Sequence, residues 1–278
     1  MALEPIGLLH PGEMGAGVGA VLVDAGHTVN WASSGRSPAS VRRAESAGLV
    51  DLGTVEEMTR SCELMISICP PANAVDVARQ VAGFGGLYID ANAIAPPTAQ
   101  QVAQLIEAGG GRPVDGGIIG GPPSTTMETH LYLSGPSAQE ASAVFAGTTV
   151  KAHVLGADPT AASAIKMCYA AWTKGTTALL LDIRALAVAL GIEGPLLGEW
   201  QQSMPELASR SLTAGRQAAT KGWRWVGEMQ EIAATFRSVG LPDGFHLAAA
   251  EIYNRVDRDE QAAADATTLR SILEALNG

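Results

Sequence analysis

Lys166 stands on a long, Ala-rich and mostly apolar segment, residues 160–190. At helical spacing, positions i+3 and i+7 from Lys166 hold Tyr169 and Thr173, which gives a narrow polar stripe. Hydride transfer to a carbonyl leaves negative charge on oxygen, so a proton or cation must be supplied there. The pattern predicts Lys166 as the general acid for reduction and the base for oxidation, with Tyr169 or Thr173 orienting the substrate. A surface lysine is the simpler alternative.

A second motif near the start of the chain, "GLLHPGEMG" (7–15), is typical of a phosphate-binding turn between a strand and a helix. Gly12 and Gly15 occupy the second and third glycine positions of such a turn, and His10 occupies the first. Histidine adopts turn geometry better than most residues, so the motif still predicts a dinucleotide site, with a plain structural turn as the alternative. The predicted cofactor-binding residues of this turn are His10, Pro11, Gly12, Glu13 and Met14.

The segment after the second expected strand favours one cofactor over another. An NAD enzyme usually places an acidic residue about 20 residues past the glycines, but no Asp or Glu occurs between Ala25 and Ala44. Ser33, Ser34 and Arg36 offer hydroxyls and a cation, which suit a 2′-phosphate. We therefore expect NADP (NADPH), with NAD and a solvated surface loop as alternatives.

Other residues with useful chemistry follow strands or stand alone. Asn92 comes directly after a strand and is expected beside the nicotinamide, and Cys69 and Pro70 are expected to shape the loop beside the dinucleotide. Trp223 and Trp225 would line a substrate pocket or an interface. The histidines His130, His153 and His246 show no metal-ligand spacing, so no metal site is expected.

Composition narrows the class of protein. The chain has 278 residues and a formal net charge of −10, so nucleic acid is a poor candidate partner. A soluble protein that acts on a small molecule is favoured. Three cysteines, an odd number with no Cys-x-x-Cys motif, indicate reduced thiols in a cytoplasm. The N-terminus lacks a basic region before its apolar residues, and no apolar run approaches the 20 or so residues of a membrane span, so neither a signal peptide nor a membrane partner is expected.

These residues need elements that position them, and the first half alternates strand and helix patterns. Such alternation predicts βαβ units and a doubly wound parallel sheet of the Rossmann type. The expected strands are 6–9, 28–32, 49–52, 63–69 and 87–90, with 113–118 and 131–134 as extensions of the sheet. The expected helices are 14–25, closed by Gly26, and 38–47, 72–81 and 97–108.

The second half is predicted to be all-helical. Asp158 is a suitable N-cap for the long helix, with Pro159 at its first position. We place a dinucleotide-binding domain at 1–155 and a helical substrate and dimerisation domain at 156–278, joined by that helix. Because residues 178–190 are apolar all round, a second copy of the chain is expected to cover them. The further helices are 197–202, 205–220, 226–239, 245–255 and 259–277.

With these motifs in order, the chain resembles the β-hydroxyacid dehydrogenase superfamily, which includes 3-hydroxyisobutyrate and 6-phosphogluconate dehydrogenases and the related imine reductases. Four stretches carry the resemblance: "GLLHPGEMGAG" (7–17), "YIDANAIAPPTAQQV" (88–102), "VDGGIIGGPP" (114–123) and "GADPTAASAIKMCYAAWTKG" (156–175). They look like the cofactor turn, the strand beside the nicotinamide, the substrate-binding glycine turn and the helix bearing the catalytic lysine. The exact residues of these stretches, such as "HPGEMG" and "KMCYAAWTKG", resemble a little-characterised branch of the superfamily that is similar to phosphogluconate dehydrogenases.

The resemblance implies a set of substrate-binding positions, and two departures qualify it. Where the family has a serine that would hold a substrate carboxylate, this chain has Ile119, and the family's Asn four residues after the lysine is Ala170. A bulkier, less polar carbonyl or hydroxy substrate is therefore favoured. Imine reduction on the same scaffold and an NADP sensor without turnover stay as alternatives. The substrate-binding residues that the resemblance implies are Gly117, Ile118, Ile119 and Gly120. Two further candidates come from their own positions in the sequence: Trp223, and Lys174, which competes with Lys166 and would reach a distal anion.

Overall fold

The structure is a computed structural model that describes residues 5–278. It divides into two compact units, Met1–Met167 and Cys168–Gly278. Residues 1–4 lie outside the described residues, and the expectation of a missing signal peptide falls partly on them. Within residues 5–278, no helix is both long and apolar enough to cross a bilayer.

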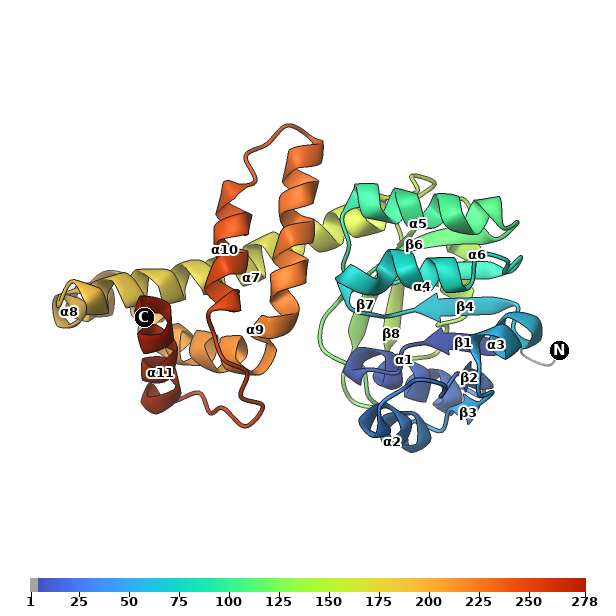
Figure 1. Ribbon diagram of the computed structural model, residues 1–278, viewed down its shortest axis with the longest axis horizontal. Helices are drawn as coiled ribbons and strands as arrows, with labels where there is room; N and C mark the ends of the chain where they lie inside the picture. Colours follow the sequence, from blue (N-terminus) through green and yellow to red (C-terminus); the bar gives the residue numbers. More distant parts are fainter. Residues whose placement is uncertain (1–4) are drawn as a thin grey trace. The chain divides into compact units, whose positions relative to one another are not determined.

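The described residues of the first unit form one sheet of eight strands in the order β3-β2-β1-β4-β5-β6-β7-β8 (Figure 1). The first six strands are parallel, β7 pairs antiparallel with β6, and β8 pairs parallel with β7. The predicted α/β class with a doubly wound, mostly parallel sheet is confirmed. The strands are β1 (Ile6–Leu9), β2 (Val29–Trp31), β3 (Val50–Asp51), β4 (Leu64–Ser67), β5 (Leu87–Asp90), β6 (Arg112–Ile119), β7 (Thr129–Ser134) and β8 (Val150–Val154).

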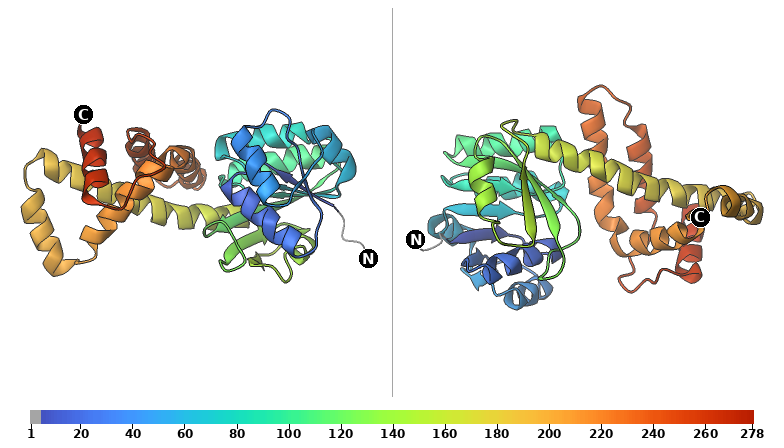
Figure 2. Two further views of the ribbon diagram at one scale, coloured as in Figure 1. Left: turned by 90° about the horizontal axis from the view of Figure 1, so that it is seen from below. Right: turned by 180° about the vertical axis from the view of Figure 1, so that it is seen from behind.

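Helices cover both faces of this sheet, as the views of Figure 2 show. Side chains alternate between the faces of a strand, so Leu8 packs in the core beneath α1, α2 and α6, whereas Leu9 packs in the core beneath α3, α4 and α5. This double burial explains why the central strands β1 and β4 are almost wholly apolar. The helices are α1 (Glu13–Asp24), α2 (Pro38–Ser46), α3 (Val55–Ser61), η1 (Pro71–Asn73), α4 (Ala74–Gln80), α5 (Pro96–Ala108) and α6 (Ala138–Ala143).

Three short elements were not predicted from the sequence: α3, α6 and β8. Helix α3 has seven residues and buries only Met58, so its apolar periodicity is too short to detect. Strand β8 is an edge strand whose last two residues are exposed, which removes the apolar alternation that marks a strand. Gly26, by contrast, ends the first helix with a φ of +93° as the sequence predicts.

The second unit is helical, as predicted. Helix α9 runs unbroken where two helices separated at 221–225 were predicted. Gly222 lies buried inside the helix, and a Cβ there would lie 3.4 Å from Tyr253 Cδ1 on α10, an ordinary contact distance. The helix therefore continues through the glycine and packs against α10 at this point. The helices are α7 (Ala161–Ala189), α8 (Glu193–Ser203), α9 (Leu207–Ser238), α10 (Gly244–Asn254) and α11 (Ala266–Asn277).

The start of α7 differs from the prediction. The helix begins at Ala161, and the Asp158 carboxylate accepts hydrogen bonds from the backbone N–H (2.9 Å) and hydroxyl (3.1 Å) of Thr160. Asp158 and Pro159 thus form a turn before the helix instead of its first positions. The compact units divide after Met167 and not at 155, because the first turn of α7 bonds to the sheet: the Ser163 N–H donates to Asp115 at 2.8 Å.

Candidate functional site

The turn between β1 and α1 is held by a left-handed histidine. His10 has a φ of +68° and is the one non-glycine residue with positive φ among residues 5–278. The Gly12 N–H donates to the His10 carbonyl at 2.8 Å, and a Cβ on Gly15 would lie 2.5 Å from that same oxygen. The chain therefore makes the tight turn with histidine where glycine is usual, at a cost of about 1 kcal/mol.

The helix that follows is open to a ligand at its N-terminus. Gly12 is the N-cap of α1, no side chain caps the turn, and a Cβ on Gly12 would meet no heavy atom within 4 Å. Backbone N–H groups at a helix N-terminus, together with the helix dipole, favour an anion such as a pyrophosphate. Of the other predicted residues of this turn, Pro11 is buried and its carbonyl accepts from Arg43 Nε at 3.3 Å. Glu13 and Met14 open the helix.

Two buried nitrogens beside this turn have no hydrogen-bond partner: His10 Nδ1 and Arg36 Nε. Burial, and next the Arg36 charge, lower the pKa of His10 to about 4, so the imidazole is neutral at pH 7. Burial lowers the pKa of Arg36 as well, while an interaction with Cys69 opposes that change. An unpartnered guanidinium nitrogen and an open helix N-terminus fit the negative charges of a dinucleotide.

The loop after β2 is tied down by an acid that the sequence analysis missed. Asp51, at the end of β3, accepts from the backbone N–H of Ser33 (3.1 Å) and of Gly53 (2.8 Å), and the Ser34 N–H donates to the Gly53 carbonyl (2.9 Å). Burial raises the pKa of Asp51, but the bonds from Ser33 and Gly53 outweigh it and lower the pKa overall. The register Trp31↔Asp51 places this carboxylate beside the second strand, and the sequence alone does not give that register.

The predicted cofactor residues of the next loops bond chiefly to one another. Asn92 is buried; its Oδ1 accepts from the Cys69 N–H at 2.6 Å and its Nδ2 donates to Ser67 Oγ at 3.1 Å. Asn92 therefore joins the loops after β4 and β5, and both ends of its side-chain amide are hydrogen-bonded within the protein. Burial, and next the Asp90 charge, raise the pKa of Cys69 to about 12, so the thiol stays protonated. Pro70 follows it, exposed.

The glycine turn and the lysine meet within the first unit. A Cβ on Gly117 would lie 3.0 Å from Lys166 Cβ, so the helix bearing the lysine packs directly on the bare strand. Ile118 points the other way, into the core beneath α1, and its predicted role in substrate binding conflicts with this burial. Ile119 is partly buried on the face of Gly117, and Gly120 continues the chain with a φ of +128°.

The remaining predicted residues belong to the second unit. Tyr169 is exposed, and the Thr173 hydroxyl donates to the Tyr169 carbonyl at 3.1 Å. Lys174 Nζ lies 2.8 Å from Glu228 Oε2, with both side chains largely buried, so its charge is already balanced. Glu228 on α9 was not foreseen as this partner. Trp223 is partly exposed, with the guanidinium groups of Arg224 and Arg258 centred 5.4 and 4.4 Å from its ring.

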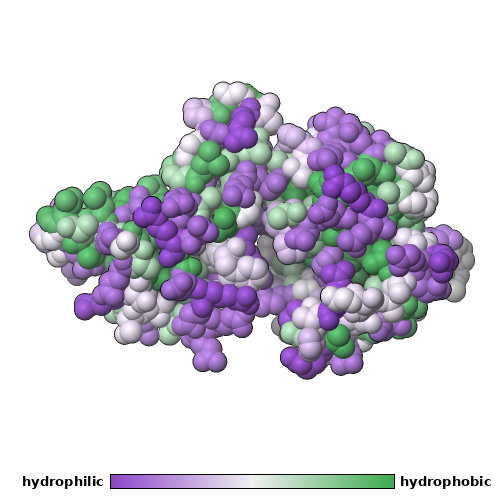
Figure 3. Space-filling view, in the orientation of Figure 1, coloured by the Kyte–Doolittle hydropathy of each residue, from purple (hydrophilic) through white to green (hydrophobic). Residues whose placement is uncertain are grey.

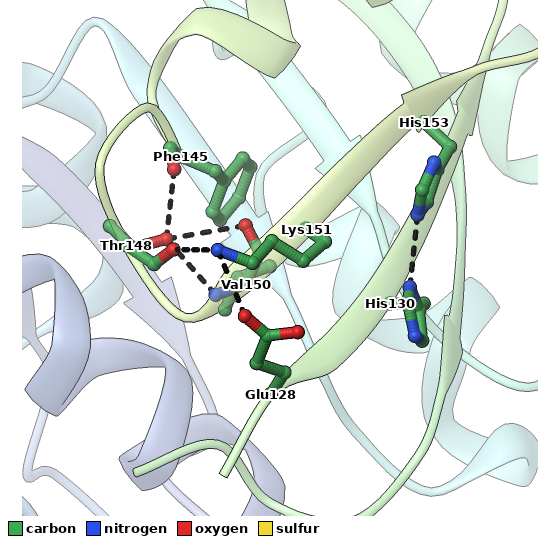
Figure 4. A network of polar contacts seen from close by, with 7 residues as sticks. All are labelled: Glu128, His130, Phe145, Thr148, Val150, Lys151 and His153. Carbon is green, nitrogen blue, oxygen red and sulfur yellow. Dashed lines mark hydrogen bonds and ion pairs between the residues drawn. The ribbon is translucent and has the colours of Figure 1, made fainter. Parts of the chain in front are cut away.

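Two histidines expected to stand alone are in contact. His130 Nδ1 on β7 lies 2.9 Å from His153 Nε2 on the edge strand β8. Figure 4 shows the two side chains facing one another across these strands. Tyr132 stacks on His153 with ring centroids 5.0 Å apart, and Lys151 pairs with Glu128 nearby. The separation of 23 residues hid this contact from sequence analysis. No group of three or more side chains able to hold a metal occurs within residues 5–278.

The fold and this turn define a nicotinamide-dinucleotide-binding protein, and comparison with known families agrees. Residues 5–150 match the NAD binding domain of 6-phosphogluconate dehydrogenase, and residues 187–256 match a domain of unknown function, DUF1932. The chain belongs to the family of that NAD-binding domain and thereby to the β-hydroxyacid dehydrogenase superfamily. Residues 5–150 therefore form an NAD-binding domain.

Individual relatives are more distant. An uncharacterised 28.5 kDa protein of Methanothermus fervidus is 27% identical over 164 residues, 59% of this chain and 63% of that protein. The 3-hydroxyisobutyrate dehydrogenase of Mycobacterium tuberculosis, solved with L-serine, has a similar fold (TM-score 0.74, 19% identity, 99% of this chain and 100% of that one). So has a reductive aminase of Aspergillus terreus, solved with an NADPH-type cofactor, cyclohexanone and allyl amine (TM-score 0.57, 20% identity, 96% and 98%).

The buried neutral histidine predicts a pH dependence of stability. The pKa of His10 is about 4 in the folded protein and about 6.5 when unfolded, so between these values the unfolded chain binds the extra proton. The free energy of unfolding should therefore fall as pH is lowered from 6.5 to 4, through this residue. His10→Gly and His10→Asn, which tolerate the left-handed turn without titrating there, should flatten that slope in urea unfolding. Parallel pH curves for all three proteins would refute the assignment.

Proposed function

We propose that the protein is an NADP(H)-dependent reductase, or the reverse dehydrogenase, acting on a carbonyl or β-hydroxy compound. The observation that carries this proposal is Lys166, packed over Gly117 on the strand that follows the dinucleotide-binding units. When bound, the nicotinamide supplies or accepts the hydride. Lys166 then donates a proton to the carbonyl oxygen in reduction and takes it back in oxidation. Tyr169 and Thr173, one and two helical turns further on α7, orient the substrate.

NADP is favoured over NAD by the charge beside the adenosine end of the site. Arg36 is the cation there, and its Nε has no hydrogen-bond partner. The Asp51 carboxylate beside the same loop is occupied by backbone N–H groups. A 2′-phosphate would pair with the guanidinium and with the Ser33 and Ser34 hydroxyls. An NAD-type ribose would instead require a carboxylate that is free to accept.

Imine reduction is the second candidate, because two side chains depart from those of hydroxy-acid enzymes. Ile119 and Ala170 stand where the superfamily resemblance implies polar groups that hold a hydroxy acid. The reductive aminase of similar fold makes the same alternative worth testing. Lys166 favours carbonyl chemistry, because an ammonium group suits a developing alkoxide better than an iminium. A sensor that binds NADP without turnover is the third reading.

The lysine assignment predicts a selective loss of turnover. Lys166→Ala should lower kcat about 100- to 10,000-fold, the usual contribution of a general acid, and leave the Kd for NADPH unchanged. The kcat is measured as consumption of NADPH with a panel of aldehydes, ketones, semialdehydes and cyclic imines, and the Kd for NADPH is measured by fluorescence titration. Lys221→Ala, at an exposed position of α9, is the matched control. A Lys166→Ala protein as active as the wild type contradicts the proposal, and a panel without any turnover favours the sensor.

The cofactor assignment predicts a split between the two nucleotides. Arg36→Leu should raise the Kd for NADPH about 10- to 100-fold, the worth of charge-assisted hydrogen bonds to one phosphate, and change the Kd for NADH less than about threefold. Arg42→Leu removes an exposed charge from the neighbouring helix and should leave both constants unchanged. A wild-type preference for NADH, or equal losses for both nucleotides, would overturn the assignment.

The second unit carries the case for a homodimer. Leu179, Leu186 and Leu190 on and just after α7 are 42, 58 and 62% exposed, and Ile192 follows at 48%. Figure 3 shows hydrophobic residues gathered around the end of α7 and α8. Apolar surface of this kind usually meets a partner, and a second copy of the same helix is the partner we propose.

The three free cysteines suit a reducing compartment, for which we propose the cytoplasm.

The dimer proposal is tested by mass in solution. Multi-angle light scattering should give twice the chain mass of 28.6 kDa for the wild type. Leu186→Glu combined with Leu190→Glu should give a monomer, because burying two carboxylates in an apolar interface is unfavourable. Val50→Glu, an exposed apolar position of the first unit, is the control and should stay dimeric. A monomeric wild type would contradict the proposal.

A further inference from the structure

Strand β6 carries a buried acid for which the proposed reaction has no use. The Asp115 side chain lies on the same face of the strand as Gly117 and is 7% exposed. Its Oδ2 accepts from the Ser163 N–H at 2.8 Å and from Ser134 Oγ at 3.1 Å, and its Oδ1 accepts from Ser163 Oγ at 2.5 Å. Ser134 Oγ in turn accepts from the Ala162 N–H at 2.9 Å.

These bonds anchor the first turn of α7 to the sheet. The first N–H groups of a helix have no partner within the helix, and here two of them, from Ala162 and Ser163, are satisfied by side chains of β6 and β7. Burial raises the pKa of Asp115, while the bonds from Ser163 and Ser134 favour the ionised form. A carboxylate at this end of the helix also complements the helix dipole.

The anchor lies one helical turn from the lysine. Ser163 and Lys166 are three residues apart and so share a face of α7, about 4.5 Å apart along the helix axis. This part of α7 packs against Gly117 of the strand, where a Cβ would lie 2.5 Å from the Ala162 carbonyl oxygen and 3.0 Å from Lys166 Cβ. The strand thus supplies both a fixed attachment and a bare surface, and any movement of the first turn carries Lys166 with it.

We propose that Asp115 is a positioning residue for Lys166: its carboxylate, through Ser163 and Ser134, fixes where the lysine ammonium meets the substrate oxygen. This rests on the proposed function, in which Lys166 donates the proton. In reduction the cofactor's hydride forms the new C–H bond, and the proton that forms O–H comes from Lys166 Nζ. Asp115 touches neither substrate nor cofactor and transfers no proton. Displacing a reacting group by about 1 Å can cost about 100-fold in rate, which sets the scale of the effect.

A double-mutant cycle tests this coupling. Asp115→Asn keeps the shape but removes the negative charge and replaces one acceptor oxygen by a donor, so the charge-assisted bonds from Ser163 and Ser134 weaken. We expect kcat to fall about 10- to 100-fold, with the Kd for NADPH within about twofold of the wild type. In the Lys166→Ala background, measured at high enzyme concentration, the same change should alter the residual rate less than about twofold. Equal effects in both backgrounds, or an unchanged kcat for Asp115→Asn, would overturn the proposal.

A readout independent of activity accompanies the cycle. Hydrogen exchange at residues 161–167 should quicken in Asp115→Asn and in the milder Ser163→Ala, while exchange in α4 stays unchanged. Ser163→Ala replaces Asp115→Asn in the cycle if the latter does not fold. Asp158→Asn is the matched control, because this exposed carboxylate bonds only to Thr160 and an amide oxygen can replace it.

The outcomes separate two failures. If Lys166→Ala retains full turnover, the proposed function falls and this inference falls with it. If Lys166→Ala is inactive while Asp115→Asn keeps full kcat, only the positioning role is overturned.

Discussion

The dinucleotide site depends on one close approach between two backbone segments. The His10 carbonyl lies where a Cβ on Gly15 would be 2.5 Å away, so residue 15 must lack a side chain for the turn and the helix to coexist. His10 reaches this geometry only with a φ of +68°. Helix α1 then begins directly at the carboxyl end of β1, with its first turn uncapped by side chains. The rest of the site is arranged around this helix end.

The same device recurs where the lysine-bearing helix meets the sheet. Gly117 removes the side chain that would collide with Ala162, and Asp115, two residues earlier on the same face, supplies the polar attachment. An alternating strand is suited to this pairing because positions i and i+2 face the same way. A helix that begins on such a strand has its first turn fixed in both distance and rotation. The cofactor turn and the helix that bears the lysine therefore both depend on a close backbone approach at a glycine, Gly15 in the first case and Gly117 in the second.

Most strands and helices of the first unit could be predicted from the sequence, because their burial leaves a recognisable pattern of apolar residues. Strands buried on both faces, such as β1 and β5, give apolar runs that need no partner to be recognised. Partners distant in the chain were invisible: Asp51 under Ser33, Glu228 beside Lys174 and His153 beside His130 are 18, 54 and 23 residues apart. These contacts depend on strand order and helix packing, which motifs do not encode. The polar stripe on the helix and the resemblance to a family both indicated the lysine, but no motif indicated the side chains that anchor its helix.

Three of the buried polar atoms without a hydrogen-bond partner belong to residues at the carboxyl edge of the parallel strands. His10 Nδ1, Arg36 Nε and Asp90 Oδ2 have no partner, and their residues follow or end β1, β2 and β5. Burial, above all, raises the pKa of Asp90 to about 7, with the Asp115 charge adding to the effect and bonds from Asn92 opposing it. Leaving such groups unsatisfied costs about 1–3 kcal/mol each, a cost that folding alone gives no reason to accept. The carboxyl edge of a parallel sheet is where such folds hold their ligands, so these atoms are most simply understood as groups whose partners arrive with the dinucleotide.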